Sequence, residues 1–124
     1  MFDGEGFVER DVFIDGGVFA AAADDAEVID AAGCYVIPGL VDLHFHGSAG
    51  GDISDGDLEG LHKMGAYEAS RGVTAICPAT MTLSEEILTQ AAKAARAYEP
   101  AENEADLVGI NMEGPYISPS KGGA

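Results

Sequence analysis

Basic residues and cysteines are scarce in this chain, and tryptophan is absent. Six lysines and arginines stand against 22 aspartates and glutamates, and the formal net charge is −16. Such a charge repels phosphate backbones and anionic lipid surfaces, so we expect neither a nucleic-acid nor a membrane partner. The two cysteines, Cys34 and Cys77, lie far apart and within apolar runs. They predict buried free thiols and not a disulfide framework.

Long apolar runs and a basic N-terminus are also missing. The first residues include acidic side chains and glycines, where a signal peptide needs basic residues followed by a continuous apolar core. No apolar run is long enough to cross a bilayer. Together with the free thiols, these absences predict a cytoplasmic location.

The chain does contain enough apolar sequence for a globular core, because 47% of its residues are hydrophobic. Near the N-terminus, residues 12–14 and 18–20 flank Asp15-Gly16-Gly17, a combination typical of a tight β-hairpin. A further strand is predicted at 27–30.

From residue 36 onward, apolar strands alternate with helix-length segments. Strands are predicted at 36–46, 73–77 and 107–113, which is the rhythm of an α/β protein with parallel strands. We expect one helix to begin after Asp55 or Asp57 and to end before Gly72, and a second to begin after Ser84. The residues expected to face inward are Leu58, Leu61, Gly65 and Ala69 in the first helix and Ile87, Leu88, Ala91, Ala95 and Tyr98 in the second.

The first of these strands ends in a histidine pair, His44 and His46. Side chains alternate along a strand, so the two imidazoles share one face, together with Asp42. Neutral imidazole is a common ligand of zinc and similar divalent ions. The pair therefore predicts the beginning of a metal site whose other ligands come from elsewhere in the chain.

The third strand supplies a carboxylate at its end. Gly109, Asn111 and Glu113 alternate on one face of that strand. If the strands are parallel neighbours, Glu113 lies at the same sheet edge as His44 and His46, where barrel enzymes carry their chemistry. We therefore predict a divalent-metal set of His44, His46 and Glu113. A carboxylate that only hydrogen-bonds a loop backbone is the alternative for Glu113.

Other polar residues receive weaker assignments. His62 lies within the first predicted helix, and we expect it on the helix surface. Asp42 is expected either to orient a metal ligand or to make a buried structural hydrogen bond. The glycines at 47, 50 and 51 are read as turn formers, with no role in binding.

Three separated motifs resemble a known family. Residues 28–47, ending in Pro38-Gly39-Leu40-Val41-Asp42-Leu43-His44-Phe45-His46-Gly47, are similar to the entry motif of the amidohydrolase superfamily. Residues 72–82, and above all Gly109-Ile110-Asn111-Met112-Glu113-Gly114-Pro115-Tyr116-Ile117-Ser118 with Lys121, resemble the N-acetylglucosamine-6-phosphate deacetylase family within it. The resemblance covers nearly the whole chain.

The resemblance implies an α/β fold, namely the N-terminal part of a metal-dependent (β/α)8 TIM-like barrel preceded by part of a small β-sandwich domain. Residues 1–37 would belong to the small β-domain and residues 38–124 to about three of the eight βα units. The chain would then be an N-terminal fragment that is inactive alone and forms a homodimer or larger homo-oligomer.

The implied reaction is hydrolysis of N-acetylglucosamine 6-phosphate to glucosamine 6-phosphate and acetate. The implied cofactor is one or two divalent ions, zinc first, with iron, cobalt or manganese as alternatives, and such an ion activates water and polarises the acetamide carbonyl. Glu113 matches the family's metal-binding glutamate, and His44 and His46 match a histidine pair that only some members retain. Ala124 falls where the family binds substrate, and the family's catalytic aspartate lies beyond residue 124.

Two alternatives remain open. A different amidohydrolase, acting on a cyclic amide or an N-acyl amino acid, would carry the same histidine pair, although the Glu113-Gly114-Pro115-Tyr116 motif argues against it. The second alternative is a non-catalytic association module, because an interrupted barrel sheet exposes strand edges that pair with another copy.

Overall fold

The computed structural model describes residues 1–121, so the predicted substrate-binding residue Ala124 lies outside the described residues. The chain divides into two compact units, Met1–Pro38 and Gly39–Ala124. The predicted metal ligands all belong to the second unit.

The first unit contains one β-hairpin and irregular chain. Strands β1 (Phe13–Asp15) and β2 (Val18–Ala20) pair antiparallel with Asp15 opposite Val18. Gly16 and Gly17 form the turn with φ values of 58° and 79°, which only glycine adopts without strain. The hairpin prediction is confirmed, whereas the strand predicted at 27–30 is wrong: those residues are exposed, irregular chain with no strand partner among the described residues.

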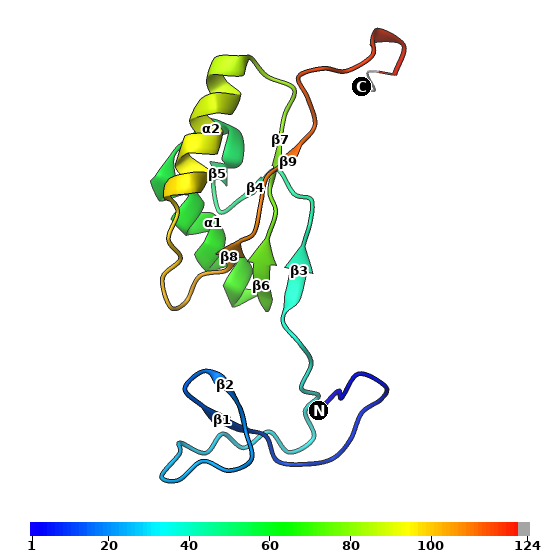
Figure 1. Ribbon diagram of the computed structural model, residues 1–124, viewed down its shortest axis with the longest axis vertical. Helices are drawn as coiled ribbons and strands as arrows, with labels where there is room; N and C mark the ends of the chain where they lie inside the picture. The colour runs from blue at the N-terminus through cyan, green and yellow to red at the C-terminus, as the bar shows by residue number, and fades with distance from the viewer. Residues whose placement is uncertain (122–124) are drawn as a thin grey trace. The chain divides into compact units, whose positions relative to one another are not determined.

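The second unit is built on a parallel sheet. Strands β3 (Leu40–Asp42), β6 (Val73–Ile76) and β8 (Asp106–Leu107) lie in the order β3-β6-β8, with both pairs parallel. Helix α1 (Leu58–Ser70) connects β3 to β6, and helix α2 (Glu85–Ala97) connects β6 to β8. Figure 1 shows both helices on the same side of the three strands. The unit is therefore a mixed α/β structure with two βα crossovers, as the alternating sequence pattern predicts.

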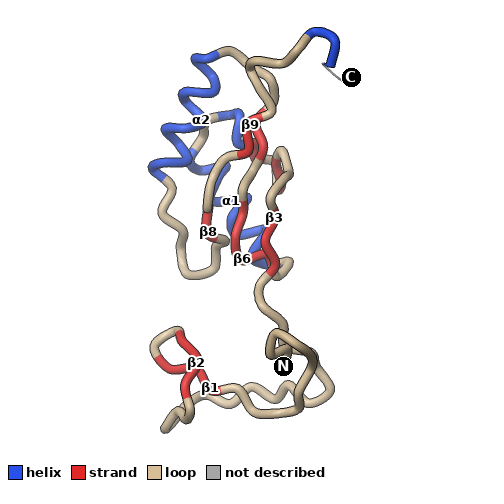
Figure 2. The backbone as a smooth tube through the Cα atoms, turned by 45° about the vertical axis from the view of Figure 1, so that its right-hand side comes forward, coloured by secondary structure: helices blue, strands red, loops and turns tan. Residues whose placement is uncertain are grey.

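The strands are shorter than the sequence predicts. After Asp42 the chain leaves the ladder, because the Asp42 carboxylate accepts a hydrogen bond from the His44 backbone N–H at 2.9 Å, a turn that competes with strand pairing. The third predicted strand is split into β8 and β9 (Asn111–Met112), and β9 pairs in parallel with β7 (Ala79–Thr80). Figure 2 shows β9 above β8, with a loop between the two strands.

Backbone hydrogen bonds nevertheless continue past the assigned strands. The Cys77 N–H donates to the Asp42 carbonyl at 2.8 Å, and the Val108 N–H donates to the Ile76 carbonyl at 2.9 Å. The three segments therefore stay side by side as they leave the sheet. This continuity brings residues 43–46, 79–82 and 111–113 to one end of the unit.

Both helices begin where their caps predict. The Asp57 side chain accepts hydrogen bonds from the backbone N–H groups of Glu59 and Gly60 at the start of α1, and Ser84 caps α2. These bonds satisfy backbone donors that have no partner within the helix. Gly72, with a φ of 85°, follows the end of α1 as expected.

A short irregular connection lies between β3 and α1. It consists of the hairpin β4 (Gly47–Ser48) and β5 (Gly51–Asp52), followed by the 3-10 helix η1 (Ile53–Asp55). A second 3-10 helix, η2 (Pro119–Lys121), comes near the C-terminus. Gly47 and Gly51 approach each other so closely that a side chain on Gly47 would overlap the Gly51 carbonyl. Gly50, with a φ of 82°, lies in the turn of this hairpin as predicted, whereas Gly47 and Gly51 belong to its strands and allow their close approach.

The core of the second unit lies between the helices and the strand ends. Leu58 and Ile87 were expected in it, but both are exposed, and each lies in the first turn of its helix. Phe45 packs against both of the buried clusters, so the segment that carries the histidines is anchored in the core. The larger cluster contains Ile53, Leu61, Met64, Ala91, Ala94 and Tyr98, and the smaller one contains Val73, Ile76 and Ala105.

The cysteine prediction needs a correction. Both thiols are free, but Cys34 is exposed and Cys77 is half-buried. Cys34 follows a glycine in irregular chain of the first unit, outside any strand of that unit. Across residues 1–121, no helix combines the length and the apolar content needed to cross a membrane.

Candidate metal centre

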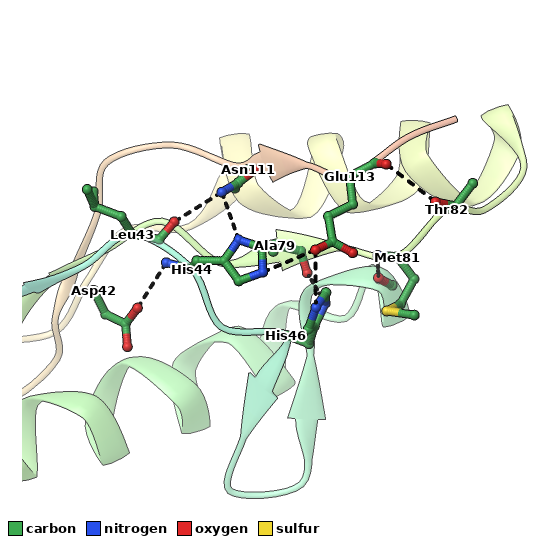
Figure 3. Close-up of polar contacts among 10 residues, drawn as sticks. Asp42, Leu43, His44, His46, Ala79, Met81, Thr82, Asn111 and Glu113 are labelled. Carbon is green, nitrogen blue, oxygen red and sulfur yellow. Dashed lines mark hydrogen bonds and ion pairs between the residues drawn. The ribbon is translucent and has the colours of Figure 1, made fainter. Parts of the chain in front are cut away.

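Three side chains from two distant segments converge at the end of the parallel strands. His44 and His46 follow β3, and Glu113 follows β9 directly. Figure 3 shows both imidazoles pointing toward the Glu113 carboxylate. The structure thus brings together the three residues that the sequence predicts as a metal set.

The distances within this cluster are short. Glu113 Oε1 lies 3.1 Å from His44 Nε2 and 3.7 Å from His46 Nε2. The two imidazole rings are nearly perpendicular, at 88°, with 5.3 Å between their centroids. The side chains of His44, His46 and Glu113 are 49%, 37% and 38% exposed, so an ion and water can reach the donor atoms.

Backbone contacts hold Glu113 in place. The Thr82 hydroxyl donates to the Glu113 carbonyl at 3.4 Å. Gly114 packs so closely on Thr82 that an added Cβ would lie 2.9 Å from the Thr82 side chain. The loop after β7 therefore sets the path of the chain directly behind the carboxylate, and a residue larger than glycine at 114 would displace it.

Two residues of the β7–β9 pair hold the histidine rings. His46 Nδ1 lies 3.1 Å from the Ala79 carbonyl, and the Asn111 amide nitrogen lies 3.0 Å from His44 Nδ1. Ala79 and Asn111 face each other in the ladder, so one pair of residues orients both rings. The contact of His46 with a backbone carbonyl through the far ring nitrogen is of the kind that generally supports a ligating imidazole in metal sites.

Sequence reasoning missed Asn111 as a site residue. The alternation along the third predicted strand puts Asn111 on the same face as Glu113. That shared face is the sequence signal that could have identified Asn111. Asp42, in contrast, contacts the His44 backbone and no imidazole ring. Asp42 therefore makes a structural hydrogen bond to the main chain, and through that bond it fixes the position of His44.

The donor set fits a divalent ion. Ligand atoms about 2.0–2.2 Å from a tetrahedral ion are roughly 3.4 Å apart, and the two N–O distances in the cluster, 3.1 and 3.7 Å, bracket that value. All three donor atoms lie within 4.8 Å of one another. Two imidazole nitrogens and one carboxylate oxygen are also the donors that zinc and iron sites use. His44, His46 and Glu113 could therefore hold a metal.

The third histidine belongs to a different cluster: His62 is half-exposed on α1, in agreement with the predicted helix-surface position, but it also contacts a neighbouring segment. His62 Nδ1 lies 2.8 Å from Glu104 Oε2, and its ring lies 5.0 Å from that of Tyr98. These contacts link α1 to the chain after α2. They are structural, because Glu104 and Tyr98 also bond the backbone of Ala101 and Ala105.

An apolar cavity of about 300 Å³ lies between α2 and β9. Leu88, Ile110 and Met112 contribute to its lining, and none of the three candidate ligands does. It is therefore separate from the metal cluster.

Comparison with known proteins places the same segments in one family. A family model described as the amidohydrolase family matches residues 27–109, a range that includes both histidines and ends before Glu113. This match is to the region that forms the parallel sheet and both helices.

Three relatives illustrate the similarity. The chain is 33% identical to an N-acetylglucosamine-6-phosphate deacetylase of Lysinibacillus sphaericus over 103 residues, 82% of this chain and 27% of that protein. It is 33% identical to the protein of the same name from Bacillus subtilis (strain 168) over 102 residues, 79% and 26% of the two chains. An N-acetylgalactosamine-6-phosphate deacetylase of Escherichia coli O157:H7 is 30% identical over 111 residues, 89% and 29% of the two chains. The chain thus spans about a quarter of the length of these curated relatives.

Proposed function

The chain belongs to the amidohydrolase family, and from this premise we propose that it is the part of a metal-dependent amino-sugar-phosphate deacetylase that carries the first metal ligands. The reaction of the whole enzyme would be hydrolysis of N-acetylglucosamine 6-phosphate to glucosamine 6-phosphate and acetate. The observation that carries this proposal is the convergence of His44, His46 and Glu113 at the ends of parallel strands.

The proposed fold of the whole enzyme is a (β/α)8 barrel with a small β-domain to which residues 1–37 contribute. Two parallel crossovers with both helices on one side of the strands support it, because a barrel repeats this unit eight times. The domain boundary at residues 37 and 38 follows the same assignment. A cytoplasmic location accords with an amino-sugar phosphate substrate.

In the proposed site, His44, His46 and Glu113 hold one or two divalent ions, zinc first, with iron, cobalt or manganese as alternatives. Such an ion supplies Lewis acidity toward a carbonyl oxygen and lowers the pKa of water. The residues of this chain position the donors: Ala79 and Asn111 orient the rings, and Thr82 fixes the backbone of Glu113. Neither Asp42 nor Asp52 reaches the cluster as a proton carrier, since their carboxylates bond the backbone of His44 and Ser54.

A second substrate is favoured by one relative. The protein from Escherichia coli O157:H7 is named for N-acetylgalactosamine 6-phosphate, and its match covers more of this chain than the two glucosamine-type matches do. The two sugars carry the same acetamide and phosphate groups. Acetate release from both sugar phosphates by the complete barrel enzyme, with unphosphorylated N-acetylglucosamine as the control, would distinguish them. Equal turnover of the unphosphorylated sugar would contradict the assignment to sugar phosphates.

Elemental analysis tests the metal site in the chain itself. After exhaustive dialysis, we expect stoichiometric zinc or iron in the unmodified chain and a loss of at least tenfold in occupancy in the His44→Ala/His46→Ala double variant, because two of three donors are removed. The matched control is His62→Ala, which removes the histidine outside the cluster. An equal metal content in the double variant and the control would contradict the proposed ligand set.

A further inference from the structure

The two histidines of the cluster are oriented by chemically different partners. His46 Nδ1 faces the Ala79 carbonyl, and His44 Nδ1 faces the Asn111 side-chain amide. A carbonyl only accepts hydrogen bonds, whereas an amide nitrogen only donates them. The partners therefore impose opposite proton positions on the two rings.

For His46, the partner favours a proton on Nδ1. The Ala79 carbonyl at 3.1 Å needs a donor, and only a protonated Nδ1 supplies one. In the neutral ring, Nε2 then carries a lone pair. This atom points toward Glu113, 3.7 Å from Oε1, so His46 offers a metal-binding lone pair without rearrangement.

For His44, the partner favours a proton on the other nitrogen. The orientation of the Asn111 amide follows from a second contact, because its nitrogen also donates to the Leu43 carbonyl at 3.2 Å. The same nitrogen directs its remaining hydrogen to His44 Nδ1 at 3.0 Å, which must then accept. The neutral ring carries its proton on Nε2, and that N–H is donated to Glu113 Oε1 at 3.1 Å.

We infer that Asn111 is a positioning residue that holds neutral His44 with its proton on Nε2, so that the two histidines are unequal metal ligands. His44 can offer its Nε2 lone pair only if the proton moves to Nδ1 and the Asn111 amide turns over, so that its oxygen accepts from Nδ1–H. That turn gives up the hydrogen bond to the Leu43 carbonyl. The number of protons on the ring does not change. The inference rests on the proposed function only for the role of His44 as a ligand.

The proton positions can be measured directly in the metal-free chain. Long-range ¹H–¹⁵N NMR spectra distinguish the two neutral forms of imidazole, and the chain has three histidines. At about pH 8, where imidazole is generally neutral, we expect the proton of His44 on Nε2 and that of His46 on Nδ1. A proton on Nδ1 of His44 would overturn the inference. This measurement does not depend on metal binding, so it separates the inference from the proposed function.

Substitution of Asn111 tests the consequence for metal binding. In Asn111→Asp, a carboxylate accepts from His44 Nδ1–H, so the proton should leave Nε2 and the zinc affinity should rise about 10- to 100-fold, the range typical for partners of ligating histidines. In Asn111→Ala the NMR spectra should show a mixture of both forms. These spectra keep the test valid even if one variant binds metal poorly for another reason.

Asn103→Asp is the matched control, because it adds the same charge at an exposed position. The zinc affinity is measured by competition with a chelator. If both aspartate variants raise the affinity equally, the effect is that of overall charge and the inference fails. If no variant binds zinc while the NMR spectra agree with the expected forms, the metal proposal fails and the assignment of Asn111 stands.

Discussion

At the scale of single residues, the neighbours of Glu104 and Tyr98 shift the pKa values of both side chains. Glu104 is partly desolvated, which raises its pKa, but hydrogen bonds from His62, the Ala101 N–H and the Tyr98 hydroxyl together lower the pKa below its ordinary value of 4.5. Burial, with the Glu104 carboxylate, raises the pKa of Tyr98 well above its usual range. His62 thus stabilises the loop around Glu104, whereas the other two histidines lie around Glu113.

The lowered pKa of Glu104 predicts a dependence of stability on pH. A carboxyl whose pKa is lower in the folded state contributes stability that is present above the unfolded value of 4.5 and is lost as the pH falls through the folded value. We expect Glu104→Gln to lower the free energy of unfolding by about 1 kcal/mol at pH 7, and the difference from the unmodified chain to shrink as the pH falls below 4.5 and through the lowered pKa of Glu104. Urea unfolding at several pH values measures both.

Glu102→Gln is the control, because Glu102 lies exposed in the same loop. It removes an equal charge from the same region. An effect of Glu102→Gln as large as that of Glu104→Gln, with the same pH dependence, would show that the general charge of the loop is responsible and not the hydrogen bonds of Glu104.

At the scale of secondary structure elements, the contact between α1 and the chain after α2 depends on a glycine. Gly65 is buried in α1, and its carbonyl accepts from the Ala105 N–H at 3.0 Å. An added Cβ at this position would overlap the Tyr98 hydroxyl. That hydroxyl cannot move freely, because it donates to the Ala105 carbonyl at 3.0 Å.

Replacing Gly65 with alanine should therefore destabilise the chain, although alanine has the higher helix propensity. Alanine normally stabilises a helix by up to about 1 kcal/mol relative to glycine, but we expect Gly65→Ala to destabilise the chain by about 1–3 kcal/mol through overpacking. Tyr98→Phe removes the overlapping oxygen, so Gly65→Ala should cost less in that background. Urea unfolding of the four proteins of this double-mutant cycle gives the coupling. An equal cost in both backgrounds would rule out the overlap as the cause.

At the scale of the whole molecule, apolar exposure and net charge oppose each other. Strand β3 lies at one edge of the sheet, and Leu40, Val41 and Leu43 are 51%, 58% and 64% exposed. Exposed apolar edge strands favour pairing between copies. The net charge of −16 repels a second copy over a distance that salt shortens.

This balance predicts self-association that increases with salt. Light scattering should give a larger average mass at about 0.3 M than at about 0.01 M ionic strength, because screening weakens repulsion while leaving the apolar attraction. Val41→Glu, which adds a charge on the exposed edge, should reduce the effect. A monomer at both salt concentrations would contradict the proposed homo-oligomeric state and the association module considered as an alternative.

The comparison of sequence and structure separates local from non-local determinants. Local signals located the hairpin turn at Gly16 and Gly17, the caps Asp57 and Ser84 and the helix stop at Gly72 correctly, because each acts within a few residues. Strand lengths were overestimated, since the hydrogen bond from the His44 N–H to Asp42 and the break between β8 and β9 leave no mark in an apolar pattern.

The sequence by itself determined the α/β class, the two helices and the three candidate ligands, because alternation and His-x-His spacing are properties of adjacent residues. Only the tertiary structure decided that Asn111 orients His44, that Ala79 orients His46 and that His62 pairs with Glu104. Each of these contacts joins residues more than 30 positions apart. Their partners depend on strand register and helix packing, which no local pattern specifies.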